Sequence, residues 1–518
     1  MRLRRDLAGI SLLLTLSGWC VAAAEEQVLA GIRQEALERS QVMDHAFFLT
    51  DVYGPRFIVS PAFYRAVEWT EERLRQIGAD RVWREGIGPV EEGGVRWSGL
   101  GWSYRRFAAH LLKPQYASLV AMPVVYSPST DGRARGEAVR VDLPEPRSEE
   151  LERFFSQHRG KLRNKILLTR PQRPIRMEPA APFSRYTEEE LEKLATVEPQ
   201  PSPPATPKPK PGGPAPPSFT EMKHNFNRLF QFLREEGVMA WVHPSAGEGG
   251  TIFVSSPMGM QDPESLPPPG IDLIPEQYNR LVRLTERGIP VTMEIELDSE
   301  IHPPKELVNL FAEIAGGEKK DELVLFGAHL DSWHGGTGAT DNASGAAVVI
   351  EAFRILRKMN LPMRRTVRAA FWGGHEIGTR GSRAYVRDHA AELANLSCYF
   401  NLDAGAGRIR GVYLQGQKQL HETLTGWLAP LKDLGAATVS LQSRMGSDQR
   451  SFHAVGVPAL SFIQDRLHYE SRTHHSTMDV YDYLPPEDLK QSAALLAALV
   501  YQAAQAPEKL RRSQEQQK

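Results

Sequence analysis

The feature that most constrains the fold is an alternation, from Val291 onward, of short apolar runs with helical patterns. Residues 323–328 form a continuous apolar run, as expected for a strand covered on both faces. Residues 346–356 follow with the apolar spacing of a helix. Further strands are predicted at 366–372, 398–402, 412–414 and 459–463. Strands separated by helices predict an α/β fold with a mostly parallel mixed sheet flanked by helices.

The chain before Val291 has a different texture. Helical spacing predicts helices over 35–49 and 62–77, with a turn at 50–56 between them. From about Ser118 the pattern changes to short β-like runs at 138–141, 166–168 and 239–242, with a helix over 226–236 before the last. Ten of the 19 residues in 199–217 are proline, so this stretch is predicted to be an extended surface loop. With 518 residues, two or three domains are expected.

The N-terminus predicts export. Three arginines precede an apolar run over residues 10–19, and Val21-Ala22-Ala23-Ala24 ends it. A basic start, a short apolar stretch and small residues are typical of a cleaved signal peptide, here 1–24. We therefore expect a periplasmic or secreted protein, with a retained anchor as the alternative and twin-arginine export left open by Arg4-Arg5. No later segment is long and apolar enough for stable membrane insertion.

Charge and cysteine content limit the other classes. The formal net charge is -1, which gives no reason to expect a nucleic-acid partner. Cys398 is the single cysteine outside the predicted signal peptide, so a disulfide framework is not expected. The oligomeric state stays open, and a homodimer is one arrangement compatible with the sequence.

Polar clusters follow the predicted strands or lie in loops after them. They contain His329 and Asp331, Asp341, His375 and Glu376, Asp403, and His474 and His475. In open α/β folds, ligands gather at the carboxyl ends of strands. Imidazole and carboxylate are the ligands expected for zinc, and one carboxylate is able to bridge two ions. Each cluster alone is weak evidence for a metal site, because single His or Asp residues often cap strand ends. Five clusters in order along the chain indicate such a site.

These motifs resemble the zinc aminopeptidase family. The string HLDSWHGGTGATDNASG at 329–345, with the His-Glu pair, NLDAG at 401–405 and HHSTMD at 474–479, carries the resemblance. The HLDSW opening is most similar to the carboxypeptidase Q-like branch, and TDVYGPR at 50–56 extends the similarity. The resemblance implies a zinc exopeptidase fold. Residues 25–117 would form the N-terminal part of the catalytic domain, and residues 118–296 would form a protease-associated β-rich insert. Residues 297–507 would form the catalytic core, and residues 508–518 a polar tail.

The resemblance also implies a ligand set for two zinc ions. Asp341 would bridge them, with His329 and Asp403 on one ion and Glu376 and His475 on the other. His475 is favoured over His474 because three residues separate it from Asp479, as in the family pattern. Asp331 would hydrogen-bond His329 and take part in catalysis by fixing its tautomer. Asp448 in the loop 446–448, and His474, are expected to contact substrate.

His375 departs from the family pattern, which has a glutamate base at this position. Neutral imidazole can move a proton near pH 7, although two nearby cations disfavour a proton on it. The expected function is an exported two-zinc exopeptidase acting on short peptides, with His375 as base or orienting group. One alternative is a catalytically impaired or non-catalytic binding relative. Another is an aminoacyl cyclotransferase of the same fold, but such cyclases generally use a single zinc, and two complete metal sites favour hydrolysis.

Overall fold

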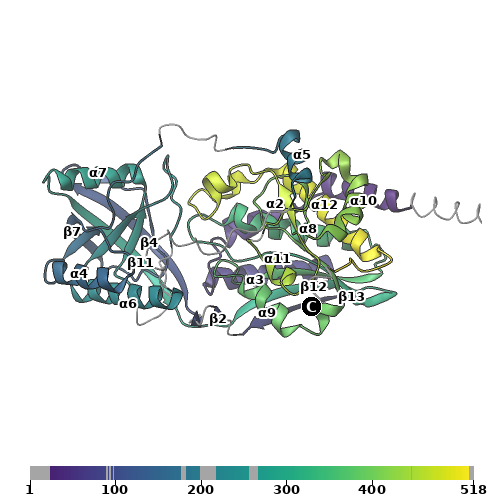
Figure 1. The fold of residues 1–518 in the computed structure, drawn as a ribbon, viewed down its shortest axis with the longest axis horizontal. Helices are drawn as coiled ribbons and strands as arrows, with labels where there is room; N and C mark the ends of the chain where they lie inside the picture. The colour runs from purple at the N-terminus through teal and green to yellow at the C-terminus, as the bar shows by residue number, and fades with distance from the viewer. Residues whose placement is uncertain are drawn as a thin grey trace, which may run out of the picture.

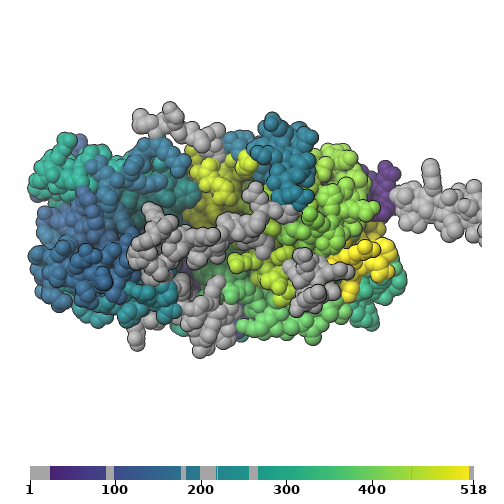
Figure 2. Space-filling view, viewed as in Figure 1, coloured from purple at the N-terminus to yellow at the C-terminus, as the bar shows by residue number. Residues whose placement is uncertain are grey.

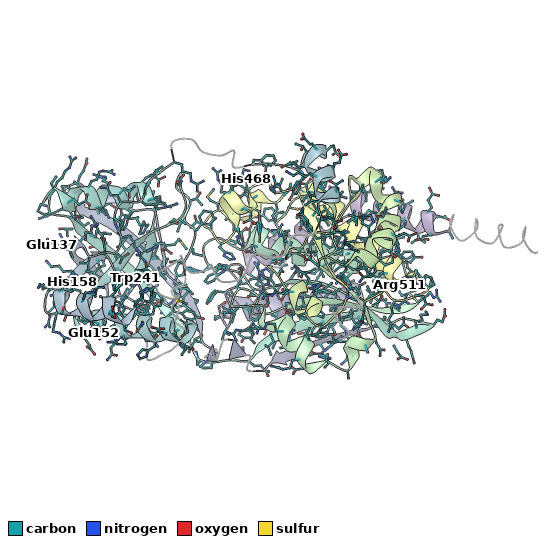
Figure 3. All side chains as sticks on the ribbon, in the orientation of Figure 1. Glu137, Glu152, His158, Trp241, His468 and Arg511 are labelled. Atoms are coloured by element: carbon teal, nitrogen blue, oxygen red, sulfur yellow. The ribbon has the colours of Figure 1, made fainter. Side chains whose placement is uncertain are left out.

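The protein forms two lobes, each built on an eight-stranded sheet (Figure 1). This computed structural model describes residues 24–88, 91–92, 95–96, 99–176, 183–198, 218–255, 266–444 and 446–512. The predicted signal peptide, apart from residue 24, and the proline-rich loop 199–217 lie outside the described residues. Trp241 lies in one lobe and Arg511 near the far end of the other (Figure 3).

The first sheet carries the strands predicted after Val291. Its order is β1 (Arg81–Ile87), β12 (Leu307–Ile314), β14 (Arg365–Trp372), β13 (Lys319–His329), β15 (Leu396–Asn401), β18 (Ala459–Gln464), β16 (Ile409–Tyr413) and β17 (Thr438–Ser440). The central strands β14, β13, β15 and β18 are parallel, whereas β1, β12 and β14 pair antiparallel, as do β18 and β16. The expected mixed α/β fold is confirmed.

Both faces of this sheet are buried, which explains the continuous apolar run of β13. Val324 and Phe326 pack in one apolar cluster, and Leu323 and Leu325 pack in another, because successive side chains of a strand point to opposite faces. Helices α8 (Ser344–Lys358) and α12 (Pro486–Gln505) contribute to the first cluster. Helices α9 (Arg380–Asp388) and α11 (Gln449–His453) contribute to the second.

The N-terminal helices also join the first lobe. Helix α3 (Pro61–Ile77) agrees with the predicted 62–77, because Ser60 accepts a hydrogen bond from the Phe63 amide at its start and Gly78 (φ 92°) ends it. The predicted helix over 35–49 was wrong in extent. A helix covers residues 24–38, and α2 (Val42–Phe47) and a π-helical turn (Phe48–Val52) follow after a break.

The second sheet has the order β5 (Ala117–Ser118), β4 (Gly101–Lys113), β11 (Thr292–His302), β7 (Arg133–Arg140), β8 (Lys165–Leu168), β9 (Ala240–Pro244), β10 (Gly270–Leu273) and β6 (Ala121–Pro123). Helices α4 (Ser148–His158) and α6 (Phe219–Glu235) cover one face, and α7 (Pro275–Glu286) covers the other (Figure 1). A separate hairpin pairs β2 (Glu91–Glu92) with β3 (Val95–Arg96). The sheet starts at β4, ahead of the expected boundary at 118, because β4 pairs with β11 over its whole length.

One segment inside the expected insert lies on the first lobe instead. Helix α5 (Glu188–Thr196) contacts β17, and the Ser440 hydroxyl donates to the Leu194 carbonyl at 2.6 Å. The Arg185 guanidinium lies 2.8 Å from Asp465 and 2.6 Å from Asp488. Figure 2 shows this segment, in blue, on the surface of the first lobe. No helix in the described part of the chain is long and apolar enough to cross a membrane.

Candidate metal centre

The polar clusters meet at one edge of the first sheet. His329 is the last residue of β13 and pairs in register with Trp372, which ends β14. Asn401 ends β15 beside the same edge, two residues before Asp403. Because these strands are parallel, the loops that follow them leave on the same side. The geometry brings together all five expected ligands, which are His329, Asp341, Glu376, Asp403 and His475.

The Asp341 carboxylate lies at the middle of this cluster. Its Oδ1 is 3.1 Å from His329 Nε2, which in turn is 3.4 Å from an oxygen of Asp403. Its Oδ2 is 3.1 Å from His475 Nε2, which is also 3.1 Å from Glu376. Each oxygen of one carboxylate therefore faces a different pair of side chains. This is the arrangement that a bridging ligand between two cations requires.

The cluster holds buried carboxylate oxygens with no hydrogen-bond partner. Among the described residues these are Asp341 Oδ2, Glu376 Oε1, Asp403 Oδ1 and Asp448 Oδ1. A buried anionic oxygen without a partner is costly unless a cation satisfies it. Three sets of three His, Asp or Glu side chains here have donor atoms within 4.8 Å of one another. The residues present fit a pair of divalent ions with nitrogen and oxygen ligands.

Charge in the cluster shifts the pKa values of its members. Burial by itself lowers the pKa of His475, but the neighbouring Glu376 and Asp341 carboxylates raise it to about 10. For His329 the charge of Asp403 likewise outweighs burial and raises the pKa well above 6.5. Burial would raise the pKa of Asp341, yet the hydrogen bond from His329 and the neighbouring His475 imidazole hold it well below 3.8. The carboxylates thus favour positive charge at the point where the ligand atoms converge.

Asp331 differs from the sequence expectation. The closest approach of its carboxylate to His329 Nδ1 is 3.8 Å, and that nitrogen instead donates to the Asp331 backbone carbonyl at 3.0 Å. The carboxylate accepts the backbone N–H groups of His375 at 3.2 Å and Glu376 at 3.1 Å. The His329 tautomer is still fixed by residue 331, but through its carbonyl. The side chain holds the His375-Glu376 turn.

His375 has a carboxylate partner. Its Nδ1 lies 2.9 Å from an oxygen of fully buried Asp448, and its Nε2 is 3.5 Å from Asp403. The ring stacks on His329 with centroids 3.9 Å apart. Burial and the neighbouring His329 lower the pKa of His375, but the charges of Asp448 and Asp403 raise it to about 9. Asp448 was expected to touch substrate, whereas the structure places it against His375.

The two adjacent histidines of the last motif both approach Asp341. His474 Nε2 is 3.6 Å from Asp341 Oδ2, and its side chain is 36% exposed. His475 is nearer at 3.1 Å and also reaches Glu376. The rings of His474 and His475 lie in contact, with centroids 3.9 Å apart.

Two supporting residues received no role in the sequence analysis. Fully buried Arg56 donates to backbone carbonyls of the loop between His329 and Asp341. Asp479 accepts from the Thr340 N–H at 2.6 Å and the Thr340 hydroxyl at 2.7 Å, next to Asp341. Burial and the charge of Asp341 raise the pKa of Asp479 to about 7. Both residues stand in motifs that the sequence analysis quoted, TDVYGPR and HHSTMD, but no local pattern reveals their partners.

The second lobe contacts the loop that carries His475. The Val254 N–H donates to the His475 carbonyl at 2.9 Å, and the Thr477 N–H donates to the Ile252 carbonyl at 2.9 Å. Phe253 and Ser476 form an antiparallel bridge between these bonds. His334, after the first motif, also reaches the second lobe, where its Nε2 donates to the Pro123 carbonyl at 2.8 Å. The chain before Val291 therefore helps to position His475, one of the five expected ligands.

Comparison with known proteins finds relatives of the first lobe among peptidases. The family model for Peptidase family M28 matches residues 309–500. Carboxypeptidase Q from Pongo abelii is 29% identical over 238 residues, which are 46% of this chain and 50% of the relative. The chain thus spans about half the length of this curated relative.

Two solved structures share the fold over nearly the whole chain. A peptidase M28 precursor from Shewanella amazonensis SB2B has a TM-score of 0.66 at 24% identity, and the likeness covers 94% of this chain and 98% of that one. BSAP, a zinc aminopeptidase from Bacillus subtilis, has a TM-score of 0.54 at 19% identity, covering 91% and 96%. The α/β fold of this chain is therefore the one that these two solved structures share. Residues 309–500 form a peptidase family M28 domain, which confirms the resemblance to zinc aminopeptidases and carboxypeptidase Q.

Proposed function

We propose that this chain is a two-zinc exopeptidase that hydrolyses short peptides. The observation that carries the proposal is the position of Asp341, whose two oxygens face different ligand pairs at 3.1 Å. The names of the relatives support it, since they include a carboxypeptidase and a zinc aminopeptidase. Export through residues 1–24 and a homodimeric state remain predictions.

The five expected ligands divide into two sets around Asp341. His329 and Asp403 would hold one zinc ion with Asp341 Oδ1, and His475 and Glu376 would hold the other with Oδ2. Zinc bound there would polarise a peptide carbonyl and lower the pKa of a water molecule in the site. Asp331 would position Glu376 by holding its backbone amide.

His375 would act as the base, oriented by Asp448. Two cations in the filled site would favour the neutral form of His375. Because a carboxylate oxygen only accepts, the hydrogen bond at 2.9 Å then leaves the proton of the neutral ring on Nδ1 and frees Nε2 to accept another. In this role Nε2 would take a proton from the water molecule that attacks the peptide carbonyl. It would then deliver that proton to the departing amine. The Asp–His pair replaces the glutamate that the family pattern places here. His474, half-exposed at the edge of the site, remains our proposed substrate contact.

His375 also lies close enough to be a ligand. His375 forms one of the three candidate metal-binding sets, together with His329 and Asp403. Substitution by alanine separates the two roles. If His375 is the base, His375→Ala should keep two zinc ions per chain and have a lower kcat. If His375 is a ligand, the variant should bind less zinc.

We propose that the second lobe is the protease-associated insert that the sequence predicted. Its sheet spans β4 to β11, and it contacts the His475 loop through Ile252 and Val254. We propose that this lobe covers the metal site and limits the length of the peptide that enters.

The test measures metal and turnover on the same preparation. Elemental analysis should give two zinc ions per chain, and a dipeptide library should show hydrolysis that a chelator abolishes and zinc restores. Asp448→Asn should lower kcat about a hundredfold or more with unchanged zinc content, because the neutral amide no longer stabilises the charged imidazole. Full turnover without metal contradicts the proposal. A large gain in His375→Glu would instead favour an impaired relative of an enzyme with a glutamate base.

A further inference from the structure

A cavity of about 560 Å³ is lined by His375, whose ring stacks on His329. Its walls come from helices α9 and α11 and from the loop at 446–447. The two helices contact each other and lie side by side in Figure 1. The cavity reaches His375 itself, so it begins one imidazole ring away from the metal ligands. A group bound in it would lie beside a peptide bond held at the ligand cluster.

The lining of the cavity is strongly cationic. Arg383 and Arg387 of α9 and Arg450 of α11 line it together with His375, and no carboxylate side chain is among the lining residues. Arg387 is partly neutralised, since its guanidinium lies 2.6 Å from its neighbour Asp388. Arg450 is exposed, and within the described part of the chain no hydrogen bond or ion pair engages its guanidinium.

The remaining walls are short and uncharged. Val386 and Val455 supply apolar surface, and the Thr379 side chain supplies a hydroxyl. Such a cavity suits a group with a short apolar stem and an anionic end. Arginine binds carboxylates with two parallel N–H bonds, and a guanidinium without a partner inside the protein retains its full donor capacity.

We propose that this cavity is a carboxylate-binding subsite that selects peptides with an anionic group next to the scissile bond. The inference rests on the proposed peptidase function for the identity of the ligand as a peptide. The anionic group comes either from an aspartate or glutamate side chain or from the terminal carboxylate of the peptide. Arg450 is the main specificity residue, and Arg383 and Arg387 add positive charge to the cavity.

The experiment compares matched substrates in the zinc-loaded protein. The pairs are Ala-Glu with Ala-Gln, Glu-Ala with Gln-Ala, and Ala-Ala with its C-terminal amide, and the quantity is the ratio of kcat/KM within each pair. We expect the wild-type protein to prefer the anionic member of at least one pair by about tenfold or more. Arg450→Ala should reduce that ratio about tenfold, Arg450→Lys less, and Arg450→Glu should reverse it. The pair that responds identifies the source of the carboxylate.

A binding measurement keeps the subsite testable if turnover is absent. Calorimetry with glutarate should give a dissociation constant that rises about tenfold in Arg450→Ala. Arg287→Ala, an exposed arginine of the second lobe, is the matched control and should bind like wild type. If Arg450→Ala loses glutarate affinity and the wild type hydrolyses no peptide, the proposed function is wrong and the subsite is supported. Unchanged ratios and unchanged glutarate affinity in Arg450→Ala would overturn the inference.

Discussion

Arg56→Lys should destabilise the metal centre, although it keeps the charge. The guanidinium is fully buried and donates to four backbone carbonyls, at 2.5 Å to Leu49, 2.7 Å to Leu330, 2.8 Å to Thr337 and 2.8 Å to Gly338. It thereby joins the N-terminal segment to both ends of the loop between the first two ligands. Burial lowers the pKa of Arg56 to about 10, so the group remains charged at neutral pH.

The expected loss follows from the geometry of the two side chains. A lysine has a single nitrogen with three donors, and it cannot reach carbonyls that lie around three separate guanidinium nitrogens. Loss of two bonds to a charged donor, at about 1.5–3 kcal/mol each, gives about 3–6 kcal/mol. If the 518 residues unfold as one unit, that free energy lowers the melting temperature by about 3–6 °C.

Differential scanning fluorimetry with and without zinc measures this change, and a zinc titration against a competing chelator measures the affinity. We expect a lower melting temperature and weaker zinc binding. The control is Arg65→Lys, because Arg65 is an exposed residue of α3. If Arg56→Lys melted with the wild type and bound zinc as tightly, the positioning role of Arg56 would be refuted.

Three further predictions follow from the same contacts. Val254→Pro removes the N–H that donates to the His475 carbonyl at 2.9 Å. Loss of about 1 kcal/mol should lower the zinc affinity about fivefold, whereas the control Val254→Ala should bind zinc like the wild type. Equal zinc affinities of the two variants would contradict a role for this hydrogen bond in positioning His475. Burial raises the pKa of Glu351, but hydrogen bonds with Arg354 and His45 outweigh it and lower the pKa from 4.5 to about 2. Because this pKa is depressed, ionised Glu351 stabilises the folded state by about 3 kcal/mol above pH 4.5, and this stabilisation is lost as the pH falls towards 2. Between these pH values the free energy of unfolding should change less with pH in Glu351→Gln than in the wild type. Finally, chelation should lower the wild-type melting temperature and zinc should restore it, because ligands that bind only the folded state stabilise it; a melting temperature insensitive to both would argue against a structural metal pair.

The sequence predicted the central part of the fold because the signals there are local. The apolar run of β13 is continuous since both faces are buried, and the helical spacing of α8 and α3 matches their observed bounds closely. Strands at the margins lacked such signals. β12 and β1 pair antiparallel at the edge of the sheet, and β4 joins the second sheet through its partner β11, almost two hundred positions away in the sequence.

The convergence of the polar clusters that hold the five expected ligands was predictable from the sequence for the same reason. Each follows a strand or lies in a loop after one, and parallel strands place their carboxyl ends on one edge of the sheet. Chain order and strand direction therefore predicted that the polar clusters meet at one edge of the sheet. The choice of His329, Asp341, Glu376, Asp403 and His475 within them came from the resemblance to zinc aminopeptidases.

Only the tertiary structure decided what surrounds those ligands. The Asp331 carboxylate holds the backbone of the next motif instead of the His329 ring, and Asp448 pairs with His375. Arg56 bonds carbonyls more than two hundred positions away, and Val254 of the second lobe holds the His475 loop. These contacts join segments distant in sequence through single side chains or single amides. They leave no periodic pattern in the chain, because hydrogen bonds between distant segments depend on how the helices, strands and loops pack and not on the local order of residues.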